Sequence, residues 1–167
     1  MFIRPIGYPF VLVDNPQLVK EKYKELNKNG EFDELIREFN KFEKSRKENY
    51  QNPKKTVSAL KKAGFIPIEI AGNYGSGINF INAVVNKHSN GSISYITNSS
   101  KTYDGIATKL QEEFEKDLRA KAPDINKVYF ISGPLQKNAN FMMDQLSMFG
   151  GGIHCLTTEE VNFEVWG

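Results

Sequence analysis

The chain has 167 residues, 40% of them hydrophobic, which suits one domain, or a large piece of one, with a buried core. Lys and Arg number 22 against 20 for Asp and Glu, so bulk charge gives no reason to expect nucleic acid or a membrane as a partner. The single cysteine, the lack of a secretory signal and the lack of a membrane-length apolar run lead us to expect a soluble chain in the reducing cytoplasm.

The first half of the chain predicts two strands, three helices and a third strand. Apolar runs at Phe2–Pro5 and Phe10–Asp14 flank a turn at Gly7–Pro9. Apolar residues then recur at helical spacing in three stretches. The expected helices run from Pro16 to Asn29, from Phe32 to Phe42 and from Val57 to Gly64. Phe65–Ile70 follows as a strand, and its proline favours a sheet edge or a strand start.

The second half repeats this order of elements. Ile78–Lys87 and Ser92–Thr97 are expected strands, joined by a hairpin turn at Ser89–Gly91. Ile106–Leu118 has helical spacing, and Val128–Ile131 is the apolar strand after it. We therefore expect an α/β fold of two strand-strand-helix-strand units, at about residues 1–72 and 73–167, in a single domain.

Cys155 is the residue with the clearest chemistry. It lies in the sequence Gly150-Gly151-Gly152-Ile153-His154-Cys155-Leu156-Thr157. A lone cysteine is usually a small buried apolar residue, and a glycine run can be a plain turn. Glycines also let the main chain approach a ligand closely and leave amides free to donate. Cys155 is therefore a candidate nucleophile, with Gly151 and Gly152 as candidate substrate contacts. His154 is not expected to be its base, because adjacent strand residues point to opposite faces.

The sequence around Cys155 resembles the C-terminal signature of the agmatine deiminases and bacterial peptidylarginine deiminases. In that group, glycines precede Ile-His-Cys, an aliphatic residue and Thr. Ile78-Asn79-Phe80-Ile81 is similar to a strand of the group that carries an Asn-Phe pair. The resemblance covers the second half of the chain, and the first half by element order. It implies a pentein fold, an α/β propeller of five strand-strand-helix-strand units around a central pocket, of which about two are present here.

The resemblance also implies a reaction and its site. A cysteine thiolate attacks the guanidinium carbon of agmatine, arginine or peptidyl-arginine, and ammonia leaves. Water then releases a ureido product from the thiouronium adduct. Cys155 is the implied nucleophile and Asn79 an implied substrate contact, with no metal and no cofactor. The resemblance leaves open which guanidino compound is the substrate, and whether the parent is a hydrolase or an amidinotransferase.

The chain departs from the family at several positions. The family's His-x-Asp motif occurs nowhere in the 167 residues, and Gly75-Ser76-Gly77 stands where an aromatic residue often precedes the family's Asn. His88 lies beside a hairpin turn, where we expect a solvated side chain. The proton shuttle and the carboxylates that hold guanidinium are therefore expected on units outside this chain. We expect a C-terminal fragment that is inactive alone.

Two other functions stay open. The chain could be a free-standing α/β binding or scaffolding module with Cys155 in its core. Gly72–Gly77 could be a phosphate loop, but the next expected element is a strand, so no helix N-terminus would receive the anion. If the chain is a fragment, exposed sheet edges would favour pairing between chains. We therefore expect a homo-oligomer.

Overall fold

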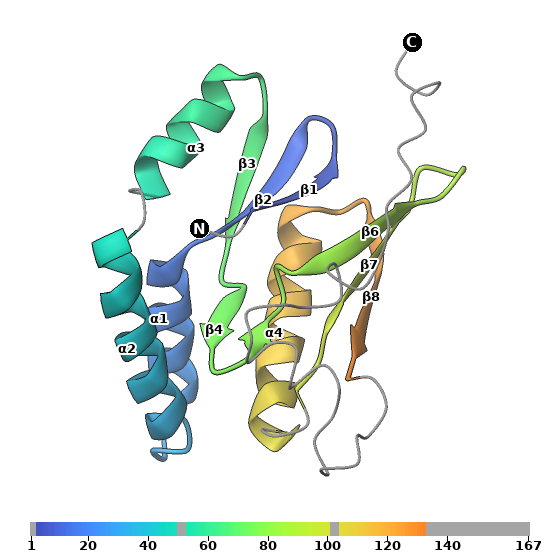
Figure 1. The fold of residues 1–167 in the computed structure, drawn as a ribbon. Helices are drawn as coiled ribbons and strands as arrows, with labels where there is room; N and C mark the ends of the chain where they lie inside the picture. Colours follow the sequence, from blue (N-terminus) through green and yellow to red (C-terminus); the bar gives the residue numbers. More distant parts are fainter. Residues whose placement is uncertain (1–2, 50–52, 101–103, 133–167) are drawn as a thin grey trace, which may run out of the picture.

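The computed structural model describes residues 3–49, 53–100 and 104–132, which form a mixed α/β structure (Figure 1). Its four helices and eight strands are β1 (Ile3–Gly7), β2 (Phe10–Asp14), α1 (Pro16–Leu26), α2 (Asp33–Asn49), α3 (Pro53–Lys62), β3 (Ile66–Ile70), β4 (Asn73–Gly75), β5 (Ile78–Asn79), β6 (Ala83–Lys87), β7 (Ile93–Asn98), α4 (Asp104–Lys121) and β8 (Ile125–Ile131). None of these helices is long and apolar enough to cross a membrane.

Two of the three sheets have the same strand order and the same sense of pairing. In the first, β2 pairs with β1 antiparallel and with β3 parallel. In the second, β7 pairs with β6 antiparallel and with β8 parallel. Helices α1 to α3 connect the parallel strands of the first sheet, and α4 connects those of the second. Parallel neighbours need such crossovers, so the predicted order of strand, strand, helix and strand is observed twice.

The segment between the two sheets differs from the prediction. Ile78–Lys87 is not one strand, because β5 ends at Asn79 and β6 begins at Ala83. The backbone of Phe80 turns away between them, donating to the carbonyl of Gly72 at 2.7 Å and accepting from side chains of the second sheet. The short strand β4, which the sequence did not predict, pairs with β5 as a small hairpin. This hairpin joins the two larger sheets.

Proline and cap positions explain how the first unit folds. The side chain of Asn15 accepts a hydrogen bond from the amide of Gln17 at 2.9 Å, and Pro16 occupies the first turn of α1, so both suit a helix start. Pro67 lies in β3, an outer strand of its sheet. Of the two positions that this proline predicted, a sheet edge or a strand start, the structure shows the edge among the described strands.

The core runs from α1 to β8 as a series of aromatic contacts. Ring centroids are 5.6 Å apart for Tyr23 and Tyr74, 5.8 Å for Tyr74 and Phe80, 5.2 Å for Phe80 and Phe114, and 6.4 Å for Phe114 and Phe130. Each such pair contributes about 0.5–1.5 kcal/mol beyond the area that it buries. The series crosses both units, so they share one core.

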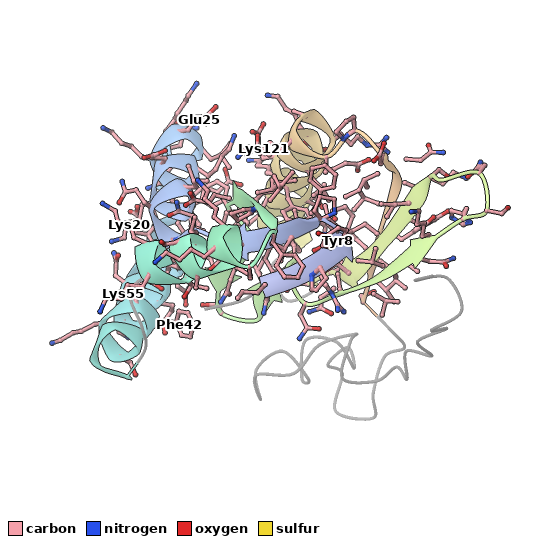
Figure 2. The ribbon with its side chains drawn as sticks, turned by 90° about the horizontal axis from the view of Figure 1, so that it is seen from above. Tyr8, Lys20, Glu25, Phe42, Lys55 and Lys121 are labelled. Carbon is pink, nitrogen blue, oxygen red and sulfur yellow. The ribbon has the colours of Figure 1, made fainter. Side chains whose placement is uncertain are left out.

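Helix α4 is attached to both units. It contacts β3 of the first sheet and β8 of the second (Figure 1). The ammonium of Lys22 on α1 lies 2.6 Å from a carboxylate oxygen of Glu113 on α4. Lys20, Glu25 and Lys55, in contrast, are exposed and project outward from their helices (Figure 2). The charged helix faces are therefore solvated, as their composition predicts.

Candidate functional site

Polar side chains lie buried where the middle strands of both sheets end. Asp14 ends β2 and is 0% exposed, and Asn98 ends β7 and is 1% exposed. In open α/β sheets, ligands bind beyond the carboxyl ends of parallel strands. Asn73 and Asn79, which face each other across the β4–β5 hairpin, are also buried. We call Asp14, Asn73, Asn79 and Asn98 the junction cluster.

The carboxylate of Asp14 fixes the chain as it leaves β3. One oxygen of Asp14 accepts from the amides of Gly72 at 3.2 Å and Asn73 at 3.0 Å. Gly72 is required at this close approach, because a Cβ there would lie 2.3 Å from Cγ1 of Ile81. These two amides follow the end of β3. The carboxylate of Asp14 thus gives them the acceptor that a neighbouring strand would otherwise supply.

The second sheet holds the same hairpin from the other side. The side-chain amide of Asn98 donates to the carbonyl of Asn79 at 3.0 Å. The hydroxyls of Tyr95 and Thr97 donate to the carbonyl of Phe80 at 2.9 and 2.8 Å. Burial raises the pKa of Tyr95, against a smaller opposing effect of the Arg4 charge, so its hydroxyl remains a donor at all ordinary pH values. The position of Asn79 is therefore fixed by both units.

The side-chain amide of Asn79 has one hydrogen-bonding group without a partner among the described residues. Its side-chain oxygen accepts from the amide of Asn82 at 3.4 Å. Its side-chain nitrogen has no acceptor within the described part of the chain, and the residue is 8% exposed. An amide N–H donor in this position can orient a carbonyl or carboxylate oxygen of a ligand. The junction cluster itself offers positioning groups and no nucleophile.

Of the predicted site residues, the structure places only Asn79. Cys155, Gly151, Gly152 and His154 lie outside the described residues, so their contact with Asn79 stays a prediction. His88 is exposed at the β6–β7 turn, and its Nε2 lies 2.8 Å from the hydroxyl oxygen of Ser94. This turn is at the opposite end of β7 from Asn98. Within residues 3–49, 53–100 and 104–132, no group of His, Cys, Asp and Glu is arranged to hold a metal ion.

Gly72–Gly77 does not form a phosphate loop. It contains β4 and the turn into β5, with Gly75, Ser76 and Gly77 at positive φ. A strand follows, as predicted, so no helix N-terminus is available to an anion.

Sequence reasoning missed three members of the junction cluster. The sequence predicts Asp14 only as the end of the strand Phe10–Asp14, and it does not single out Asn73 or Asn98. The available signal was a polar residue directly after an apolar strand, as in Val11-Leu12-Val13-Asp14 and Ile96-Thr97-Asn98. Asn73 gave no such signal, because its burial depends on the hairpin.

Comparison with protein-family models, with curated proteins and with solved structures finds no match to this chain.

Proposed function

We propose that this chain is the C-terminal, nucleophile-bearing part of a guanidine-modifying hydrolase of the pentein type. Cys155 is the nucleophile, and the substrate is agmatine, arginine or peptidyl-arginine. The observation that carries the proposal is the pair of sheets with identical strand order, joined by the hairpin that presents Asn79. The glycine-rich sequence before Cys155 supports it independently.

The proposed reaction needs three reacting groups, which are a thiolate, a guanidinium group and water. The sulfur of Cys155 bonds to the guanidinium carbon, and the carbon–nitrogen bond breaks as a proton is delivered to the leaving ammonia. Water then adds to the thiouronium carbon, and the thiolate leaves with the ureido product formed. A bound cation favours the thiolate over the thiol. The proton shuttle and the guanidinium-binding carboxylates come from units outside this chain, since no His-x-Asp motif occurs in it.

Asn79 contacts a part of the substrate other than the guanidinium. Guanidinium has only N–H donors, so it needs acceptors, whereas the free group of Asn79 is an N–H donor. Asp14, the nearby acceptor, already holds two backbone amides. Asn79 therefore orients an oxygen of the substrate, as a peptide carbonyl or a carboxylate would supply. This contact favours arginine or peptidyl-arginine over agmatine, which has neither oxygen.

The outer strands provide surfaces for further units or for a second copy. Among the described residues, β3 and β8 lie at sheet edges. Ile66 on β3 is 49% exposed, and Ile131 on β8 is 39% exposed. Apolar edge strands pair readily with other chains. We expect dimers or larger oligomers in light scattering of the isolated chain, and a monomer at all concentrations would count against these surfaces.

The enzymatic proposal is tested on the protein as its own cells produce it. A purification tag at the natural locus recovers the chain with any further units. Ammonia release is then measured with free arginine, an arginine peptide and agmatine. The expected result is release from at least one substrate, lost completely in Cys155→Ser with an unchanged circular dichroism spectrum. Equal rates for the natural protein and Cys155→Ser would overturn the proposal.

The effect of replacing Asn79 on KM, compared between the substrates, tests the role of Asn79 separately. Asn79→Ala is expected to raise KM for the substrate that carries a carbonyl or carboxylate, and to leave KM for agmatine unchanged. Equal effects on all substrates would assign Asn79 to the fold rather than to substrate binding.

A further inference from the structure

We propose that the β6–β7 hairpin and β8 form a binding pocket for the phosphate group of a small phosphate monoester. A pocket of about 380 Å³ lies there, lined by three serines, two asparagines, His88, Lys127 and Tyr129. It lies at the opposite end of β7 from the junction cluster and does not depend on the function proposed above. We call it the hairpin pocket.

A β-bulge in β8 places the lysine in the hairpin pocket. Ile93 pairs with Ile125, but Ser94 pairs with Lys127, so Asn126 is the extra residue. Regular pairing would put Lys127 opposite Tyr95, on the face that is buried in the core. The bulge instead puts Lys127 opposite Ser94, on the other face of the sheet. Bulges often redirect side chains next to functional sites.

The polar groups of the hairpin pocket are arranged to donate. Nε2 of His88 lies 2.8 Å from the hydroxyl oxygen of Ser94, which is 7% exposed. The side-chain oxygen of Asn90 accepts from the amide of Ser92 at 3.0 Å and from its hydroxyl at 2.7 Å. This leaves the amide nitrogen of Asn90 as the free group. The hydroxyls of Ser92 and Ser94 are already bonded within the pocket. The donors left for a ligand are the side-chain amides of the two asparagines, the hydroxyl of Ser89 and the ammonium of Lys127.

The charge in the hairpin pocket is unbalanced. Among the residues that the structure describes, no carboxylate lines it. Across the described ranges, Lys127 has no carboxylate partner, whereas Lys22 and Lys109 are paired with Glu113 and Glu31. A cation surrounded by neutral donors attracts a compact oxyanion, because charge-assisted hydrogen bonds to it are strong. A phosphate group, with several acceptor oxygens, matches this set of donors.

Because of Tyr129, we expect the hairpin pocket to bind a phosphate monoester more tightly than free phosphate. Tyr129 lines the pocket, and the residue is 45% exposed. An organic group attached to the phosphate would cover this ring and bury apolar area that inorganic phosphate cannot. The observations therefore favour a monoester, with free phosphate as the second source of the same group.

Nuclear magnetic resonance titration of the ¹⁵N-labelled chain tests the proposal. Inorganic phosphate and phenyl phosphate are added separately at constant ionic strength, because salt screens exposed charges. The expected result is saturable shifts of amides in residues 88–94 and 126–129. Phenyl phosphate is expected to bind at least about threefold more tightly, from contact with Tyr129. Equal binding of the two would support the hairpin pocket with free phosphate as its occupant.

Two lysine variants give a matched control. Lys127→Gln is expected to weaken binding about tenfold, because it removes the charged donor. Lys20→Gln removes the same charge from the exposed face of α1, away from the hairpin, so less than about a twofold effect is expected. Shifts that do not saturate, or equal weakening by the two variants, would overturn the proposal.

Discussion

The side-chain amide of Asn98 donates a hydrogen bond to the backbone carbonyl of Asn79, across 19 residues of sequence, at 3.0 Å. This bond joins the end of β7 to the β4–β5 hairpin, and both residues are buried. The backbone position of Asn79 therefore depends on the second sheet. A backbone carbonyl that loses its donor inside a protein costs about 1–3 kcal/mol.

Replacement of Asn98 is expected to destabilise the fold. Asn98→Asp exchanges the donor for an acceptor that faces the carbonyl of Asn79, so the free energy of unfolding should fall by about 2–3 kcal/mol. Urea denaturation measures it. Asn86→Asp, on the exposed part of β6, is the matched control, with an expected change within about 0.5 kcal/mol. Equal losses at the two positions would contradict the structural role of Asn98.

Gly72→Ala is expected to destabilise the chain by about 1–3 kcal/mol, as overpacking does. The new methyl would lie 2.3 Å from Cγ1 and 2.7 Å from Cδ1 of Ile81, so a buried side chain must move. Gly105→Ala in α4 is the control, because no atom lies within 4 Å of a methyl there. It should be neutral or stabilising by up to about 1 kcal/mol. Thermal denaturation of both variants checks the contrast, and similar shifts would refute it.

The Lys22–Glu113 ion pair is expected to stabilise the contact between the two units by about 1 kcal/mol. Its atoms are 2.6 Å apart, and the side chains are only 16% and 20% exposed. A double-mutant cycle with Lys22→Met and Glu113→Gln isolates the coupling energy. Zero coupling near neutral pH would show that the pair contributes nothing.

The same coupling should depend on pH in a defined direction. The hydrogen bond from Lys22 lowers the pKa of Glu113 below 4.5, although burial opposes it. Burial lowers the pKa of Lys22, but the hydrogen bond to Glu113 and the charge of Asp117 outweigh it and leave the pKa above 10.5. The contribution of Glu113 is therefore complete above pH 4.5 and is lost as the pH falls through its lowered pKa. That of Lys22 is complete below pH 10.5 and is lost as the pH rises further.

Two neighbouring tyrosines are expected to respond differently to loss of the hydroxyl. The hydroxyl of Tyr23 donates to the carbonyl of Tyr74 at 2.6 Å, so Tyr23→Phe leaves a buried acceptor unpaired and should cost about 1–3 kcal/mol. Within the described part of the chain, the hydroxyl of Tyr74 is buried without a hydrogen-bond partner, so Tyr74→Phe should be neutral or stabilising. Chemical denaturation of the two variants measures the difference. A larger loss for Tyr74→Phe would show a partner such as a buried water.

The order of elements could be predicted because it depends on local signals. Helical spacing of apolar residues, Pro16 at a helix start and Pro67 in a strand each act within a few residues. The break after Asn79 could not be predicted this way. Ile78-Asn79-Phe80-Ile81 continues into a β-prone run, and the chain turns only because Phe80 meets Gly72, Tyr95 and Thr97 from distant segments.

The candidate sites show the same difference between features set by local sequence and features set by distant contacts. Asn79 was predicted from a sequence resemblance, and the structure places it in a buried polar cluster. Asp14 and Asn98 were missed because their partners are 59 and 19 residues away. Lys127 was missed because a bulge at Asn126 decides which face it occupies, and sequence periodicity assumes regular pairing.

The reactivity of Cys155 tests the central claim most directly, because it is the chain's single thiol. The rate of alkylation by iodoacetamide near neutral pH is measured in the folded chain and in denaturant, with Cys155→Ser as the blank. A nucleophile presented on a glycine-rich loop should react in the folded chain about as fast as in the unfolded one. Protection until the chain unfolds would contradict the account and would favour a scaffolding module with a core cysteine.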